Sequence, residues 1–151
     1  MKSPLWLLFV ALQFFHLFFL LFHDWLPLGH WNDVAAFQKS TTLPEKILSL
    51  LIPSAPVAFG LAFTLLHTAT PHRVSFRLIL SAVYGSLFLG ELEAWWIPYA
   101  FGASAERVAR YRALFSATHS FLPARHGITP NSLHVVLHAS TLATLILIWA
   151  I

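Results

Sequence analysis

The stretch "VSFRLILSAVYGSLFLGELEAWWIPY", residues 74–99, decides how this chain folds. It exceeds the roughly 20 apolar residues that cross a bilayer, yet near its end it carries Glu91, Glu93 and two adjacent tryptophans. An ionisable side chain in an apolar span is costly, and such groups mark polar pockets or pathways inside helix bundles. The stretch therefore predicts a membrane helix with a polar site near one end.

The composition of the whole chain indicates the same class of protein. Its 151 residues are 58% hydrophobic and only 10% charged, which is too little charge to cover the surface of a soluble domain. The first apolar run lacks a small-residue cleavage site, so we interpret it as a span and not as a signal peptide. We expect one all-α domain over residues 1–151, an integral membrane four-helix bundle with spans at 5–22, 47–67, 74–98 and 132–151.

The loops between these spans are unequal in length. The tight turn "TATPHR" at 68–73 predicts that the second and third spans form an antiparallel hairpin. The long loop at 101–131 contains "SAERVARYRALF", which predicts a short amphipathic helix. The two longer loops hold six of the nine lysines and arginines, while Lys2 and two arginines lie on the other side. The positive-inside bias then predicts cytoplasmic long loops.

Two features limit the functions that the chain can have. It contains no cysteine, which removes disulfides, thiolate nucleophiles and sulfur ligands for metals. Its net charge of +3 comes from basic residues that flank the apolar runs, where such residues set topology or contact lipid headgroups. We therefore expect the lipid bilayer as a partner and no nucleic acid.

Ionisable groups recur at one depth of the predicted bundle. Because a helix rises about 1.5 Å per residue, His16, Glu91 and His138 each lie roughly 10 Å from the long-loop end of their span. His134 lies on the same helical face as His138, one turn nearer that end. Glu93 is about 200° around the helix from Glu91, so both carboxylates cannot enter one pocket. We expect Glu91 to point inward and Glu93 to point outward.

This cluster is compatible with three kinds of chemistry. Imidazoles and a carboxylate form a nitrogen and oxygen set that suits zinc or iron, so His16, Glu91, His134 and His138 are candidate metal ligands. Glu91 and His138 are also candidate catalytic residues for acid–base chemistry on a lipid-like or isoprenoid substrate. Axial ligation of haem or another tetrapyrrole by His16 and His138 is the third interpretation.

The long loop supplies candidate binding residues outside the spans. Segment 118–131, with its prolines and glycine, predicts an irregular lid over the polar pocket. Arginine recognises carboxylate and phosphate groups through paired hydrogen bonds. The candidates for holding an anionic headgroup or a cofactor are Arg107, Arg110, His119 and Arg125.

Three segments carry a resemblance to known proteins. These are "DWLPLGHWNDV" at 24–34, "ELEAWWIPY" at 91–99 and "RYRALFSATHSFLPARHGITPNSLHVVLH" at 110–138. They resemble a group of small four-span bacterial membrane proteins of unknown activity. The resemblance implies location in a bacterial inner membrane and implies nothing about a substrate.

The sequence thus leaves two classes of function open. The first is a membrane protein whose His and Glu pocket binds a metal ion or acts on a lipid-like molecule. The second is a non-catalytic subunit of a homo-oligomer or a larger membrane complex, with or without a tetrapyrrole. In that second case Glu93, the phenylalanine-rich first span and Trp149 would form the contact surface.

Overall fold

The computed structural model describes residues 3–69, 71 and 73–151, whose regular structure is helical apart from an isolated bridge between Arg125 and Ile128. Lys2 and parts of the predicted tight turn, Thr70 and His72, lie outside these residues. The elements in chain order are α1 (Pro4–Phe22), η1 (Gly29–Trp31), α2 (Val34–Ser40), α3 (Leu43–Leu66), α4 (Val74–Glu91), η2 (Leu92–Trp96), α5 (Ile97–Phe101), α6 (Ala105–Phe115) and α7 (Ser132–Ala150).

Four helical segments are long and apolar enough to span a membrane, as the sequence predicts. They cover Pro4–Phe22, Leu43–Leu66, Val74–Phe101 and Ser132–Ala150. The second begins four residues earlier than expected because Thr42 and Glu45 form a capping box there. The third continues through η2 and α5 to Phe101 as one helical run. The all-helical fold with four segments of spanning length is therefore confirmed, and their insertion into a membrane stays a prediction.

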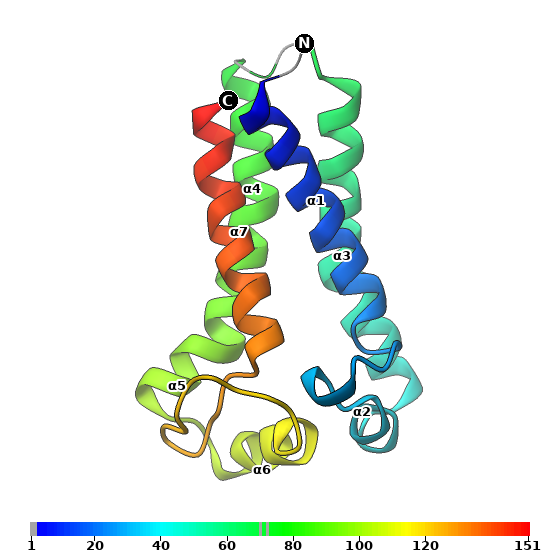
Figure 1. Ribbon diagram of the computed structural model, residues 1–151, viewed down its shortest axis with the longest axis vertical. Helices are drawn as coiled ribbons and strands as arrows, with labels where there is room; N and C mark the ends of the chain where they lie inside the picture. Colours follow the sequence, from blue (N-terminus) through cyan, green and yellow to red (C-terminus); the bar gives the residue numbers. More distant parts are fainter. Residues whose placement is uncertain (1–2, 70, 72) are drawn as a thin grey trace.

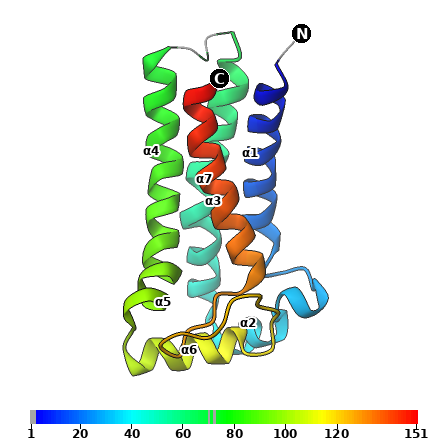
Figure 2. The same cartoon turned by 60° about the vertical axis from the view of Figure 1, so that its left-hand side comes forward.

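The long helices run side by side, with both chain termini at the end where α3 turns into α4 (Figures 1 and 2). α1 packs against α3 and α7, while α4 packs against α7 and α3. The short helices α2 and α6 lie together at the opposite end, called the loop end below. Toward that end α3 and α4 move apart in the view of Figure 1, while the chain at the end of α1 stays against α7, with the ring centroids of His23 and His134 5.3 Å apart.

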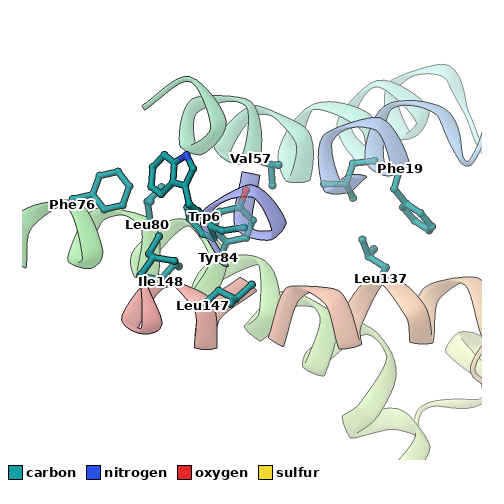
Figure 3. Packing of buried hydrophobic residues seen from close by; sticks show 12 residues of the cluster. Trp6, Phe19, Val57, Phe76, Leu80, Tyr84, Leu137, Leu147 and Ile148 are labelled. Atoms are coloured by element: carbon teal, nitrogen blue, oxygen red, sulfur yellow. The ribbon is translucent and has the colours of Figure 1, made fainter. Parts of the chain in front are cut away.

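The apolar core is densest near the short turn. Figure 3 shows Trp6, Phe76, Leu80 and Tyr84 gathered there, and all four side chains are buried. α3 approaches α4 closely at Gly60, where an added Cβ would lie 3.2 Å from a methyl carbon of Val83. The bundle is therefore tightly packed at the end with the short turn, and α3 and α4 move apart beyond it.

The third span contains a wide π-helical turn, η2, just after Glu91. The Ile97 N–H bonds the Leu92 carbonyl, five residues earlier, where an α-helix would bond the fourth. Pro98 has no N–H to offer the Ala94 carbonyl, and the Tyr111 hydroxyl of α6 donates to that carbonyl instead. Pro98 thus accounts for an irregular turn that ties the span to α6. Such turns occur often at functional sites.

A helix, α6, occupies the position in the long loop where the sequence predicts one. The Ser104 hydroxyl accepts the Arg107 N–H and so caps its first turn. The segment after it folds back over α6 at Gly127, whose φ is +77° and whose added Cβ would lie 2.9 Å from Val108. Only glycine fits this close approach without strain. The amphipathic, surface-lying character of α6 stays a prediction.

Single cysteines can test the topology, because the chain has none of its own. Ser40 and Ala109 lie on α2 and α6 at the loop end, and Ala69 lies in the short turn, and all three are exposed. We expect cysteines at Ser40 and Ala109 to react with an impermeant maleimide from one side of sealed vesicles, and one at Ala69 from the other. Labelling of Ser40 and Ala109 from opposite sides would contradict the four-span arrangement.

Candidate functional site

A pocket of about 490 Å³ lies in the loop half of the bundle between α1, α3, α4 and α7. Its wall is mostly apolar, and Ile52 and Pro56 of α3 face Ser86 and Gly90 of α4 across it. These four residues are also exposed at the surface, so the pocket opens sideways between α3 and α4. The polar side chains in its wall are those of His23, Ser86, Glu91, His134 and His138.

The two carboxylates of the third span have opposite environments. Glu91 is only 6% exposed and lines the pocket, whereas the Glu93 side chain is 75% exposed and lies 3.8 Å from Arg107. The inward and outward directions expected from the helical period are therefore confirmed. One Glu91 oxygen, Oε1, accepts a hydrogen bond from the Thr141 hydroxyl at 2.8 Å. The other, Oε2, is buried without a partner.

Thr141 lies between Glu91 and His16. Its hydroxyl oxygen is 3.2 Å from His16 Nε2, and that nitrogen is also 3.0 Å from the Ser140 hydroxyl. When Glu91 is ionised, Thr141 donates to it and His16 Nε2–H donates to the two hydroxyl oxygens. When Glu91 is protonated it can donate to Thr141, which then donates to the Leu137 carbonyl at 3.1 Å. This network can accommodate both states of the carboxyl group.

His138 has a defined tautomer. Trp96 Nε1, which can only donate, lies 3.0 Å from His138 Nδ1. That nitrogen must therefore be the acceptor, so the proton is on Nε2 and the imidazole is neutral. The η2 turn brings Trp96 to this position while its neighbour Trp95 packs against His134, with ring centroids 4.8 Å apart. His138 can thus offer a hydrogen-bond donor to a ligand.

His134 and His23 separate this pocket from a second, smaller cavity. Their ring centroids lie 5.3 Å apart, and both residues also line a space of about 110 Å³ that contains Asp24 and Asp33. His23 Nε2 lies 3.2 Å from the Asp24 carboxylate. Burial raises the pKa of Asp24 above its ordinary value, and the charge of His23 opposes that shift. A small cavity with polar walls therefore lies next to the pocket, on its loop-end side.

The structure does not support the metal centre expected at His16, Glu91, His134 and His138. Over residues 3–69, 71 and 73–151, no group of three or more histidines, aspartates or glutamates is placed to hold an ion. Thr141 separates His16 from Glu91, and His138 Nδ1 is taken by Trp96. His134 is surrounded by aromatic rings, among them Phe115. The four residues lie at a similar depth in the bundle, but their nitrogen and oxygen atoms do not converge on one point where an ion could bind.

The four binding residues expected from the long loop do not line the pocket. Arg110 is 3.3 Å from Glu45, and Arg107 is the neighbour of Glu93. His119 Nδ1 lies 2.9 Å from the Ser132 hydroxyl, and its ring packs on Trp31. Arg125 forms its backbone bridge with Ile128. These contacts tie α6 to α3 and η2, and the loop after α6 to η1 and α7, at the loop end.

Some parts of the site were not foreseen from sequence. One of them is Thr141, which is fully buried and bridges two ionisable groups. Pro53 and Pro56, which line the pocket, lie in the middle of α3, and a proline there removes a helical hydrogen bond. The signal that could have found the pocket was this pair of prolines at the depth of Glu91.

The fold and the pocket define an all-helical bundle whose four longest helical segments have the length and hydropathy of membrane spans. No family model matches the chain, and searches of curated proteins and of solved structures found no significant match.

Proposed function

We propose that this chain is a multi-pass integral membrane protein that binds a lipid-like molecule in the sideways-opening pocket. The single observation that carries the proposal is the pocket itself, about 490 Å³ in volume with a mostly apolar wall. Pockets of roughly 300–1,000 Å³ with a few polar groups on an apolar wall are typical of small-molecule sites. The apolar body of the ligand would lie against α3 and α7, with its polar group at Glu91 and His138.

The outer surface of the bundle supports insertion into a membrane. Many large apolar side chains point away from the core, for example Phe18 at 61%, Leu89 at 66% and Leu66 at 81% exposure. A soluble monomer rarely exposes so much contiguous apolar surface. In a bilayer the same surface faces lipid, and an opening between α3 and α4 admits a molecule directly from the lipid phase.

The location follows from the charges and from the resemblance noted in the sequence. The loop end carries Lys39, Lys46 and the arginines of α6, and the positive-inside bias favours a cytoplasmic position for such a surface. The resemblance to small bacterial four-span proteins favours the bacterial inner membrane. The pocket would then lie in the cytoplasmic leaflet.

Contacts within the chain weaken the alternative of a non-catalytic subunit. Trp149 Nε1 donates to the Ser81 hydroxyl at 3.1 Å, and Glu93 lies beside Arg107. Both residues thus have polar neighbours in this chain. A ligand in the pocket would instead bond a group that has no hydrogen-bond partner among the described residues, Glu91 Oε2.

Quenching of Trp95 provides a direct test, since this residue lines the pocket. Brominated octadecanol, added to protein in uncharged micelles, is expected to quench part of the tryptophan fluorescence saturably. A Trp95→Phe variant should lose that part, because the other five of the six tryptophans lie outside the pocket wall. Quenching that rises without saturation, or that is unchanged in the variant, would contradict binding in this pocket.

A matched pair of glycine variants tests the place of binding. An added Cβ meets nothing within 4 Å at Gly90 and at Gly85, so both helix positions tolerate a larger side chain. Gly90 lines the pocket and Gly85 does not. Gly90→Phe is expected to weaken octadecanol binding at least about tenfold, which is about 1.4 kcal/mol, while Gly85→Phe leaves it unchanged. Equal effects of the two variants would place the probe elsewhere.

A further inference from the structure

The pocket is lined by a residue with one strong hydrogen-bond acceptor that no group among the described residues satisfies. Glu91 is 94% buried, its Oε1 accepts from Thr141, and its Oε2 has no partner. A buried carboxylate oxygen without a donor is unfavourable, because burial removes its water and nothing replaces it. Because Glu91 lines the pocket, a ligand whose donor reaches this oxygen would be strongly bound.

The other charged and polar groups of the wall do not fill this position. Among the described residues, neither a lysine nor an arginine lines the pocket. His138 is neutral because its Nδ1 accepts from Trp96, and His23 lies beside Asp24. The wall thus offers one uncompensated acidic group to anything that enters. The Glu91 carboxylate would attract a ligand group with a positive charge and repel one with a negative charge.

An aromatic surface lies in the same part of the wall. Trp95 is four residues after Glu91, is 5% exposed and lines the pocket. A tryptophan face attracts a cation through the quadrupole of its ring, and the attraction is stronger where water is excluded. The Glu91 carboxylate and the Trp95 indole together suit a protonated amine. The amine would donate its N–H groups to the carboxylate and place its positive charge over the indole ring.

We propose that the lipid-like molecule bound in this pocket carries a protonated amine as its headgroup, held by the unpartnered oxygen of Glu91. This inference rests on the proposed function, because it names the class of ligand for the same pocket. The sideways opening between α3 and α4 suits such an amphiphile, whose chain stays in lipid while its amine reaches Glu91. The bound ammonium group neutralises the carboxylate inside the span.

Three probes with one chain and different headgroups test the headgroup separately from the pocket. Octadecylamine, octadecanol and octadecanoate are each used to displace brominated octadecanol from the protein in uncharged micelles near neutral pH. Octadecylamine is expected to compete at least about tenfold better than octadecanol, and octadecanoate should compete worst. The Gly90→Phe variant measures adsorption of the amine to the micelle and the protein surface, which is subtracted.

Glutamine variants assign the preference to one carboxylate. Glu91→Gln is expected to abolish the preference for the amine while octadecanol still binds. Glu93→Gln, the matched control on the outer face, should retain the preference. If Glu91→Gln does not fold, the comparison of the three probes on the unmodified protein still tests the headgroup.

The possible outcomes separate the two proposals. Equal competition by all three probes, or a preference for octadecanoate, would overturn the amine headgroup and leave a lipid-binding pocket. A preference for the amine that survives in Glu91→Gln would also overturn it. Failure of the brominated probe to bind at all would overturn the proposed function itself.

Discussion

A Thr141→Val variant is expected to lose about 2 kcal/mol of unfolding free energy, although threonine and valine have nearly the same shape. The hydroxyl is fully buried and donates to Glu91 Oε1 at 2.8 Å, while Oε2 already has no partner. Its removal leaves both carboxylate oxygens without a donor, so the cost exceeds the roughly 0.6 kcal/mol of an average hydrogen bond between membrane helices.

Thr144→Val is the matched control for this variant. Thr144 is equally buried on α7, but its hydroxyl donates only to the Ser140 carbonyl of its own helix. Its replacement should change the unfolding free energy by less than about 0.6 kcal/mol. Reversible unfolding in mixed micelles measures both variants. Similar losses for the two would mean that Thr141 acts only through packing.

A double-mutant cycle assigns the loss to the carboxylate. In a Glu91→Leu background the buried acceptor is absent, and Thr141→Val should then be nearly neutral. The coupling between positions 91 and 141 is expected to be about 1–2 kcal/mol. A coupling near zero would show that the hydrogen bond between Thr141 and Glu91 does not contribute to stability.

The Asn131→Ala variant is expected to destabilise the loop end by about 2 kcal/mol, of which the lost helix cap accounts for about 1. Asn131 is 1% exposed, and its side-chain oxygen accepts the N–H groups of Leu133 and His134 at the start of α7. Its amide nitrogen also donates to the Trp31 carbonyl, 100 positions away in sequence, at 2.9 Å. One side chain therefore starts a span and fixes the first loop against the long loop.

Asn131→Ser separates these two roles. Serine can still cap α7, but it is too short to reach Trp31. We expect it to recover about half of the lost stability while leaving the loops more open to hydrogen exchange. Exchange of the His119 amide, which donates to the His30 carbonyl at 2.7 Å between the same loops, reports the opening. Unchanged exchange in both variants would contradict the bridging role of Asn131.

Helical periodicity was enough to find the faces that meet inside the bundle. Gln13 and His16 of α1 are completely buried, as are Thr141 and Thr144 of α7, and the members of each pair are three residues apart on one face of the helix. Glu91 is buried and Glu93 exposed for the same reason. These results depend only on the period of the helix and on the cost of exposing polar groups to lipid, both of which act along a single segment.

Periodicity could not find which atoms meet. His16, Glu91, His134 and His138 were grouped by depth, but a common depth leaves the distance across the bundle undetermined. That distance depends on how the four long helices pack and on the η2 turn, which directs Trp96 to His138. The predicted metal site is not supported, because the Thr141 hydroxyl lies between His16 and Glu91 and the Trp96 indole bonds His138 Nδ1.

By itself the sequence determined a helical bundle with four apolar spans, a polar interior on three of them, and one inward carboxylate, because hydropathy and helical period are local properties of the chain. Only the tertiary structure decided that a pocket opens between α3 and α4 and that Thr141 joins Glu91 to His16. It also decided that one oxygen of Glu91 remains without a partner. These features arise from the packing of helices that are distant in sequence, and the pattern of a single span does not contain those distances.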